Sequence, residues 1–416
     1  MDVMFKFCAG LDVHKRIVVA CVLLSSPEGL QRHIQTFPTM LAGLEALAAW
    51  LAGFGVTHVA MESTGVYWKP VYNVLSAHFD VWIVNARDLK QVPGRKTDVK
   101  DAEWIAQLMR LGLLKRSFIP DVEQRDLRDL TRYRTRLTAE RAAASNRLQK
   151  VMEDANIKLA SVATDSQGVS VRAMLAALIN GETDPAQLAE LAKGRLRAKI
   201  PALEQALSGH VREHHRFMWR EVLEHIDELN TRLMLLNQRI RELTAPYESI
   251  IQRLAAIPGV DRYTAEVILA EIGPNVTPFP TAKHLASWAC LCPGNDISAN
   301  KRRSGKTRRG NNWLRTALVE AAWAASRAKD TYLSSQFHRL RARRGDKRAA
   351  VAVAHSIFIV VYHLLAKPEA VFTELGGDYF LKRNPEQEQR RAVRKLEGLG
   401  FTVTLTPVVV TAATAA

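Results

Sequence analysis

The spacing of apolar residues divides this chain into a first part of mixed strands and helices and a longer, mostly helical part. Up to about residue 112, alternating apolar and polar positions predict strands at residues 5–13, 16–24, 30–39, 57–63 and 80–85. Apolar positions three and four residues apart predict a helix over residues 40–54. Three hairpin-like strands followed by alternating helices and strands predict a compact α/β domain of about a hundred residues.

Two heptad-like stripes mark the charged helical sequence that begins after Pro120. The first consists of Leu127, Leu130, Leu137, Ala144, Leu148 and Val151, interrupted by Arg134 and Arg141. The second consists of Val222, Ile226, Leu229, Leu233, Leu236, Ile240 and Leu243. Such stripes pack helix against helix, within one chain or between chains. They predict coiled-coil-like segments and offer an element for dimer formation.

Breaks in the helical pattern set the expected domain limits. Gly, Ser and Pro residues between about 165 and 201 indicate a helical insertion or a loop region. From about residue 250 the sequence is largely helical around a glycine-, serine- and arginine-rich middle, and the tail beyond Gly376 is expected to be weakly ordered. The predicted parts are residues 1–118, 119–249, 250–375 and 376–416.

The positive charge of the chain is concentrated in one segment. The 416 residues carry a formal charge of +16, and residues 301–348 alone hold fifteen Lys or Arg against three acids, a net +12. Such a field suits a polyanion, with nucleic acid the first candidate and an acidic membrane surface the second. No run of about 18 apolar residues predicts a membrane span, and no signal peptide opens the chain. Four cysteines in no disulfide or zinc pattern indicate a reducing, cytosolic location.

Four acidic residues of the first part fall at the ends of predicted elements. Asp12 and Glu62 close strands, while Asp98 and Asp101 open a helix. If that helix continues to about Gly112, both aspartates share a stripe with Ile105 and Leu108, so they point towards the sheet.

Two interpretations of these acids remain open. Asp98 and Asp101 alone would serve as an N-cap and a first-turn acid of the helix. Four carboxylates at one sheet edge would instead need cations, because two of them about 4 Å apart repel by roughly 4 kcal/mol at an effective dielectric constant near 20. A hard divalent ion, Mg²⁺ or Mn²⁺, fits such oxygen ligands.

The basic segment contains two candidate serine nucleophiles, Ser298 and Ser304. A serine hydroxyl needs a base, a metal ion or neighbouring cations to attack, so these serines could equally belong to a phosphate-binding loop. Upstream, residues 254–273 resemble a helix-hairpin-helix element with Gly259 in its turn, which would aim backbone N–H groups at a phosphate. An ordinary packing hairpin is the alternative.

Three segments together resemble one family. GLDVHK from residue 10, MESTGVYW from residue 61 and PGRKTDVKDAEWIAQLMRLGLL from residue 93 are similar to the RuvC-like, ribonuclease-H-fold domain of the DEDD insertion-sequence transposases. The region from about residue 250 is similar to the C-terminal transposase domain of that family. The resemblance implies a metal-binding tetrad of Asp12, Glu62, Asp98 and Asp101.

The same resemblance implies a serine that attacks DNA and becomes attached to it. The spacing from Pro293 and to Gly310 favours Ser298, whereas Ser304 precedes a glycine, so Ser304 is kept as the alternative. It also implies DNA partners at the element ends and target, a guide RNA as in some family members, and a dimer or tetramer. The residues expected to bind nucleic acid are Arg95, Lys96, Lys100, Gly259, Lys301, Arg302, Arg303, Lys306, Arg308, Arg309, Asn311 and Arg315.

Three functions therefore compete at this point. A transposase or recombinase would use the tetrad, Mg²⁺ or Mn²⁺ and the serine in a transesterification, in the bacterial cytoplasm close to the nucleoid. A junction-resolving or other nuclease would use water in place of serine, which explains the first domain but leaves the long C-terminal half without a role. In a nucleic-acid-binding protein without catalysis, the acids would only cap and pack.

Overall fold

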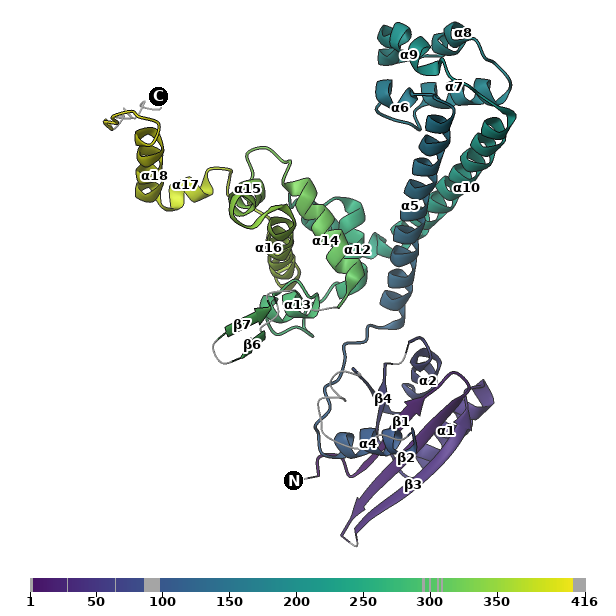
Figure 1. The fold of residues 1–416 in the computed structure, drawn as a ribbon. Coiled ribbons are helices and arrows are strands. Elements are labelled where there is room, and N and C mark those ends of the chain that lie inside the picture. Colours follow the sequence, from purple (N-terminus) through teal and green to yellow (C-terminus); the bar gives the residue numbers. More distant parts are fainter. Residues whose placement is uncertain are drawn as a thin grey trace. The chain divides into compact units, whose positions relative to one another are not determined.

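The chain forms two compact units, Met1–Pro120 and Asp121–Ala416 (Figure 1). The computed structural model describes residues 3–27, 29–63, 65–85, 98–293, 296–298, 301–304, 307 and 310–406, and for 98–100, 296–298 and 301–304 it describes the backbone.

The first unit is built on a five-stranded mixed sheet of order β3-β2-β1-β4-β5. Its strands are β1 (Phe7–Val13), β2 (Ile17–Ser26), β3 (Gly29–Pro38), β4 (His58–Glu62) and β5 (Asp80–Val84). The first three strands pair antiparallel, and β4 and β5 continue the sheet parallel to β1. All five strands expected from the alternation of apolar residues are confirmed.

Helices cover both faces of this sheet, because its central strands are apolar on both sides. Helices α1 (Leu41–Gly53) and α2 (Trp68–Leu75) share one core with Leu11 and Met61. Helix α4 (Asp98–Arg110) packs on the opposite face, over Cys8, Cys21 and Ala60. A Cβ atom on Gly10 would lie only 2.3 Å from the Ala102 carbonyl oxygen, so this close crossing of α4 over β1 requires glycine.

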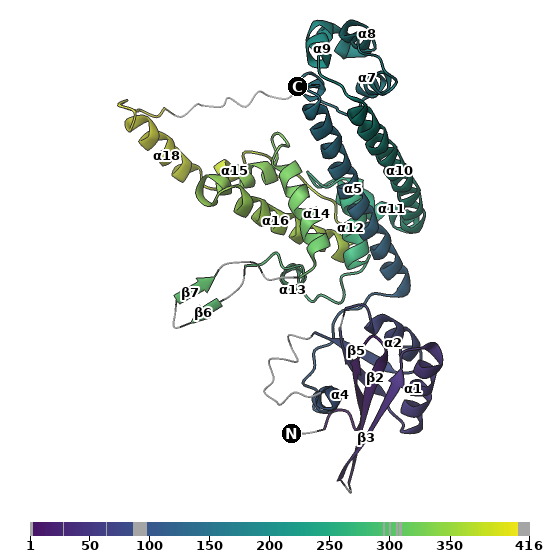
Figure 2. The same cartoon turned by 45° about the vertical axis from the view of Figure 1, so that its right-hand side comes forward.

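Two long helices form an antiparallel hairpin in the second unit. Helices α5 (Val122–Asp154) and α10 (Glu213–Thr244) lie side by side in both views (Figures 1 and 2). Leu127 clusters with Ile240, and Leu137 clusters with Leu229 and Leu233. The two predicted stripes therefore face each other within one chain, and the alternative that they pair between chains is not needed to bury them.

The segment between the long helices folds into a small helical cap. It contains α6 (Leu159–Val162), α7 (Val169–Ile179), α8 (Pro185–Glu190), the 3₁₀ turn η1 (Gly194–Lys199) and α9 (Ile200–Leu207). Its apolar residues share a core with Leu148 and with the fully buried Trp219. The sequence predicted an insertion here, and the core explains how it is stabilised.

The rest of the second unit is mostly helical. It comprises the 3₁₀ turn η2 (Ala245–Tyr247), α11 (Glu248–Ala255), α12 (Arg262–Ile272), α13 (Ala282–Trp288), the strands β6 (Asp296–Ser298) and β7 (Lys301–Ser304), α14 (Asn312–Ala325), α15 (Tyr332–Arg344), α16 (Asp346–Ala366), α17 (Tyr379–Arg383) and α18 (Pro385–Glu397). The tail expected to be weakly ordered thus contains two helices, in neither of which a residue is buried.

Helix α16 corrects the expectation that the sequence contains no apolar run of membrane-spanning length. Among the described residues it is the one helix long and apolar enough to cross a membrane, by length and composition. Half of its apolar window is buried, and it packs against α13, α14 and α15, as the core helix of a folded domain does. Its apolar length is therefore accounted for by packing within the unit.

Candidate functional site

Two of the four predicted acids follow paired residues on neighbouring strands. Leu11 of β1 pairs in parallel register with Met61 of β4, so Asp12 and Glu62 come next on the two strands. Adjacent strands lie about 4.8 Å apart, and residues at matching positions point to the same face. Asp12 shares the face of Gly10, which α4 covers, so both carboxylates belong to the α4 side of the sheet.

The first turn of α4 lies near the edge of the sheet at which β1 and β4 end. Helix α4 runs opposite to β1, because Cys8 donates to the Ala106 carbonyl at 3.6 Å while Gly10, further along the strand, approaches Ala102. The next step along β1 brings Asp12 towards the turn that contains Asp98 and Asp101. Asp101 is half-buried there, and Ile105 and Leu108 are buried as the predicted stripe requires.

Several predicted residues of this region lie outside what the structure describes. Arg95 and Lys96 precede the described part of α4, and the side chains of Asp98 and Lys100 are not described. Their assigned roles stay predictions.

His14 joins this edge of the sheet, although sequence reasoning did not select it. Its Nε2 lies 3.0 Å from Oδ2 of Asp12. The two residues are separated by one position at the end of a strand, and that spacing places side chains on the same face. The GLDVHK segment therefore contained the signal, in its Asp-Val-His order.

A divalent metal ion suits the chemistry of these donors, but the described side chains alone do not build its site. Carboxylate oxygens are the ligands that Mg²⁺ and Mn²⁺ prefer. Within the described ranges, no three His, Cys, Asp or Glu side chains gather closely enough to hold a metal ion. The fourth acid, Asp98, would have to complete the set.

The basic segment forms a two-stranded hairpin rather than an open loop. Strands β6 and β7 pair antiparallel, with Ser298 opposite Lys301 and Asp296 opposite Ser304. Ser298 therefore sits next to the turn, whereas Ser304 lies at the other end of the paired region. Lys301, Arg302 and Arg303 belong to β7, and Lys306, Arg308 and Arg309 fall outside the described residues.

Asn311, predicted to bind nucleic acid, has a structural partner. Its side-chain oxygen accepts from the Leu314 N–H and so caps α14, while its Nδ2 donates to Glu271 at 2.7 Å. Arg315, one turn into the same helix, is half-buried. Asn311 thus fixes the start of α14, directly after the basic hairpin, to α12.

Glu271 is a completely buried carboxylate held by arginines. Arg132 donates to it through two nitrogens at 2.7 and 2.8 Å, and Nε of Arg128 lies 3.5 Å away. Burial lowers the pKa of Arg128 to about 10, against the opposing effect of Glu271, so Arg128 remains charged at neutral pH. The pairs tie α12 to α5.

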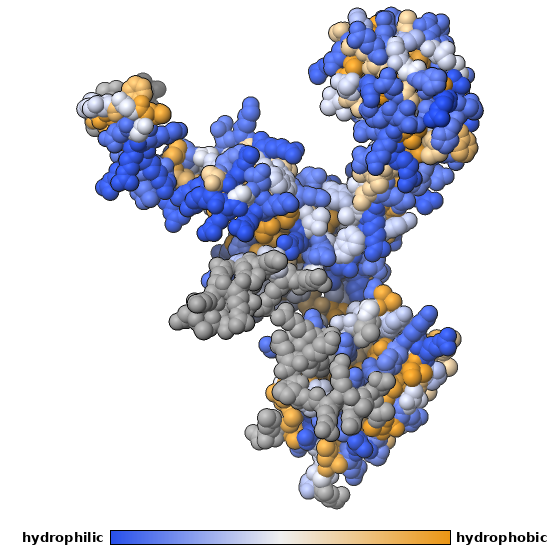
Figure 3. Space-filling view, viewed as in Figure 1, coloured by the Kyte–Doolittle hydropathy of each residue, from blue (hydrophilic) through white to orange (hydrophobic). Residues whose placement is uncertain are grey.

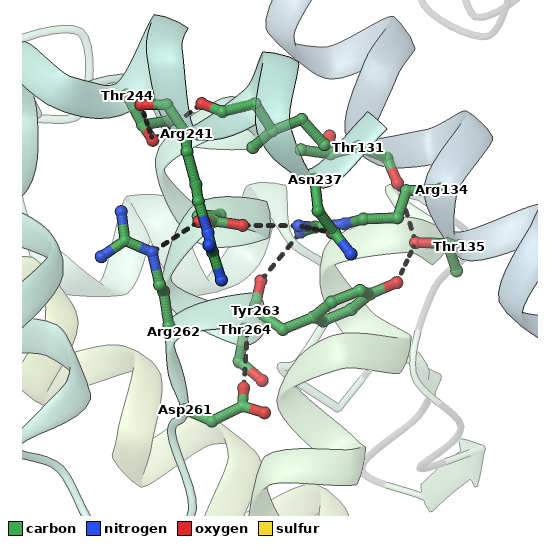
Figure 4. A network of polar contacts seen from close by, with 12 residues as sticks. Thr131, Arg134, Thr135, Asn237, Arg241, Thr244, Asp261, Arg262, Tyr263 and Thr264 are labelled. Carbon is green, nitrogen blue, oxygen red and sulfur yellow. Dashed lines mark hydrogen bonds and ion pairs between the residues drawn. The ribbon is translucent and has the colours of Figure 1, made fainter. Parts of the chain in front are cut away.

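A second buried network surrounds Arg134, which interrupts the first apolar stripe (Figure 4). Its guanidinium donates to Glu266 at 2.5 Å and to Asn237 at 3.1 Å, and lies 3.9 Å from the ring centre of Tyr263. Arg262 donates to the same glutamate at 2.9 Å. These contacts join α5, α10 and α12. Arg134 therefore interrupts the apolar stripe because it holds these three helices together.

The hairpin glycine Gly259 packs closely against another helix. Its φ is +86°, and a Cβ atom there would lie 2.2 Å from the Ala321 carbonyl oxygen of α14. The backbone conformation and the close packing each require glycine at this position, and the packing agrees with the alternative of an ordinary hairpin. Its role in phosphate binding stays a prediction.

Comparisons with known proteins identify the class to which this acidic edge and basic hairpin belong. A family model described as "Transposase" matches residues 9–157, and one described as "Transposase IS116/IS110/IS902 family" matches residues 251–339. The first match contains Asp12 and Glu62, and the second contains the basic hairpin. The protein is a transposase.

Two relatives agree with these matches. A probable family 20 transposase of Pseudomonas aeruginosa is 25% identical over 324 residues, covering 74% of this chain and 84% of the relative. The transposase for insertion sequence element IS1111A of Coxiella burnetii is 26% identical over 367 residues, covering 86% and 90%. The chain belongs to the IS110 family of insertion-sequence transposases.

Proposed function

We propose that this transposase cuts and rejoins DNA by transesterification, with Ser298 as the nucleophile. In the first step the Ser298 hydroxyl loses its proton and bonds to phosphorus, while the bond from phosphorus to one sugar oxygen breaks and that oxygen takes up a proton. In the second step a DNA hydroxyl loses its proton and bonds to the same phosphorus, and the serine oxygen leaves and takes up a proton. The observation that supports this proposal most is that Asp12 and Glu62 lie at the same edge of the sheet, on the face that α4 covers.

Asp12, Glu62, Asp98 and Asp101 would hold Mg²⁺ or Mn²⁺ in this proposal. A bound ion of this kind polarises the phosphodiester and lowers the pKa of the attacking hydroxyl. His14, at 3.0 Å from Asp12, would orient that carboxylate. The strand order β3-β2-β1-β4-β5, with the acids at the ends of β1 and β4, supports a RuvC-like, ribonuclease-H-like fold for the first unit.

Basic residues of the second unit would bind the DNA backbone. Lys301, Arg302 and Arg303 lie on β7 beside the candidate serine, and Arg315 follows on α14. Contacts of this kind position DNA without reading its sequence. We therefore propose that sequence selection comes from a structured guide RNA, which rests on the resemblance to the family.

An assay of DNA cleavage tests the chemistry. Purified protein, the transcripts of its element and supercoiled DNA carrying the element ends are incubated with Mg²⁺. We expect a protein–DNA adduct that survives denaturation, lost in Ser298→Ala and retained in Ser304→Ala. Nicked DNA with free ends and no adduct would favour the nuclease that uses water. An adduct that persists in Ser298→Ala but not in Ser304→Ala would transfer the role to Ser304.

A further inference from the structure

A groove at the open end of the α5–α10 hairpin differs in charge from the rest of this basic protein. It has a volume of about 740 Å³ and is lined by the start of α5, the end of α10 and residues near them. Its apolar lining consists of Leu127, Leu130, Leu243, Leu269, Pro246 and Pro274. Its charged lining is mostly acidic, with Asp121, Glu123, Asp126, Asp129 and Glu242 against Arg239, which pairs with Glu242 at 3.2 Å. Such a groove fits a partner that is both apolar and basic.

The C-terminal helix α18 has those two properties. Its second half is basic, with Arg390, Arg391, Arg394 and Lys395 against Glu397, and no residue of the helix is buried. Arg390 and Arg391 pair with Glu386 and Glu388 of the first half, so Arg394 and Lys395 are the basic residues considered for docking. Leu396, Leu399, Phe401 and Leu405 remain 43–67% exposed on the helix and the segment after it. Figure 3 shows apolar side chains at the surface in this part of the chain. A helix of 13 residues is marginal on its own in water, so α18 needs an apolar partner.

The groove and the helix are complementary in both respects. We propose that α18 of one copy docks in the acidic groove of a second copy of this chain. Its apolar residues would cover the leucines and prolines of the groove. Arg394 and Lys395 would face Glu123 and Asp126, two exposed carboxylates that form no ion pair within the described part of the chain.

Helix α18 is attached to the rest of the second unit through α17. Tyr332 of α15 packs against Tyr379 and Phe380, with ring centres 5.0 and 5.2 Å away, and so anchors α17. Asn384 alone separates α17 from α18. The ribbon views show α18 following α17 at the C-terminal end of the chain (Figures 1 and 2).

Reciprocal docking would give the contact enough strength for a dimer. A helix of this length spans about 20 Å, and one such contact alone falls below the area of an ordinary stable interface. In a two-fold symmetric pair, each copy supplies one helix and one groove, so the second contact forms within an existing complex. The dimer element would thus be α18, while the long helices bury their stripes within the chain.

Charge reversal on the full chain, free of nucleic acid, tests this docking by sedimentation velocity over a concentration series. We expect dimers of the wild type, and dissociation constants raised on the order of tenfold by Arg394→Glu with Lys395→Glu, or by Glu123→Lys with Asp126→Lys. The matched control is Lys150→Glu with Arg232→Glu, two exposed residues elsewhere on the long helices, which should leave the dimer unchanged.

Mixing the two reversed proteins distinguishes docking between copies from docking within one. In the mixed pair an acidic α18 meets a basic groove and a basic α18 meets an acidic groove, so dimers should return to the wild-type strength. Circular dichroism checks that each variant is folded. A wild type that stays monomeric, a dimer indifferent to both reversals, or a mixture that fails to recover would overturn the proposal.

Discussion

The buried carboxylates of the second unit and the carboxylates at the sheet edge of the first unit are used in opposite ways. In the second unit Glu266 and Glu271 are buried, and arginines of α5 neutralise them at hydrogen-bonding distance. In the first unit Glu62 and Asp101 are half-buried at the sheet edge and form no ion pair with a side chain that the structure describes. The same residue type therefore holds helices together where arginine faces it and leaves its charge available where none does.

The strongest test of this difference is Asp12→Asn. The substitution keeps the shape of the side chain but removes the charge proposed for metal binding, so DNA cleavage should fall roughly a thousandfold or more. Thermal stability should change little, because Asp12 is partly exposed rather than part of the buried core. Cleavage is measured on supercoiled substrate and stability by thermal unfolding. A stable fold that cleaves at the wild-type rate would assign Asp12 a structural role.

Glu271→Gln should show the reverse pattern. Removing this charge leaves two arginines facing a buried neutral side chain, which should cost about 3–5 kcal/mol of unfolding free energy. Urea unfolding measures it, and Glu242→Gln, at an exposed glutamate, is the control. A loss below about 1 kcal/mol would mean that solvent reaches the pair and that burial does not set its strength.

Basic residues of the hairpin should affect binding in a salt-dependent way. Alanine at Lys301, Arg302 and Arg303 should weaken DNA binding and flatten its dependence on salt, by about 0.9 in the logarithmic slope per lost phosphate contact. Binding is measured by fluorescence anisotropy between 50 and 200 mM salt, roughly the range over which such contacts weaken strongly. An unchanged slope would remove β7 from the DNA interface.

The smallest effect concerns Asp154, at the far end of α5. The hydrogen bond from His215, at 2.8 Å, holds the pKa of Asp154 below its usual value, with Arg212 adding to the effect. The folded chain thus binds this proton less readily than the unfolded chain, so the stabilisation is present above about pH 4 and lost as the pH falls below it. Urea midpoints of the wild type and Asp154→Asn should converge on acidification. A constant gap would contradict this linkage.

Local patterns predicted the first unit well. Some of its strands are apolar on one face and others on both faces, so their positions show in the sequence. Because the ends of neighbouring parallel strands meet at one edge of the sheet, Asp12 and Glu62 could be chosen from the sequence. His14 was missed because its proximity to Asp12 was not considered, although the spacing contained it. The tetrad as a whole still depends on Asp98, whose side chain lies outside the described residues.

Long-range partners could not be predicted from the sequence. Arg134 breaks a heptad pattern, and its partner Glu266 is 132 residues away, so the sequence showed only the interruption. The stripes themselves did not reveal whether they pair within or between chains, because both arrangements bury the same residues. The expectation that Asn311 binds nucleic acid comes from the resemblance to the family, and its bond to Glu271 appears only in the fold.

The most direct test of the proposed chemistry is to identify the residue that carries DNA. The adduct formed with Mg²⁺ is digested with nuclease and protease, and the nucleotide-bearing peptide is sequenced by mass spectrometry. The proposal predicts a nucleotide on Ser298 in wild-type protein and no adduct in Asp12→Asn. A nucleotide on any residue other than Ser298, or full cleavage with no modified peptide, would contradict it.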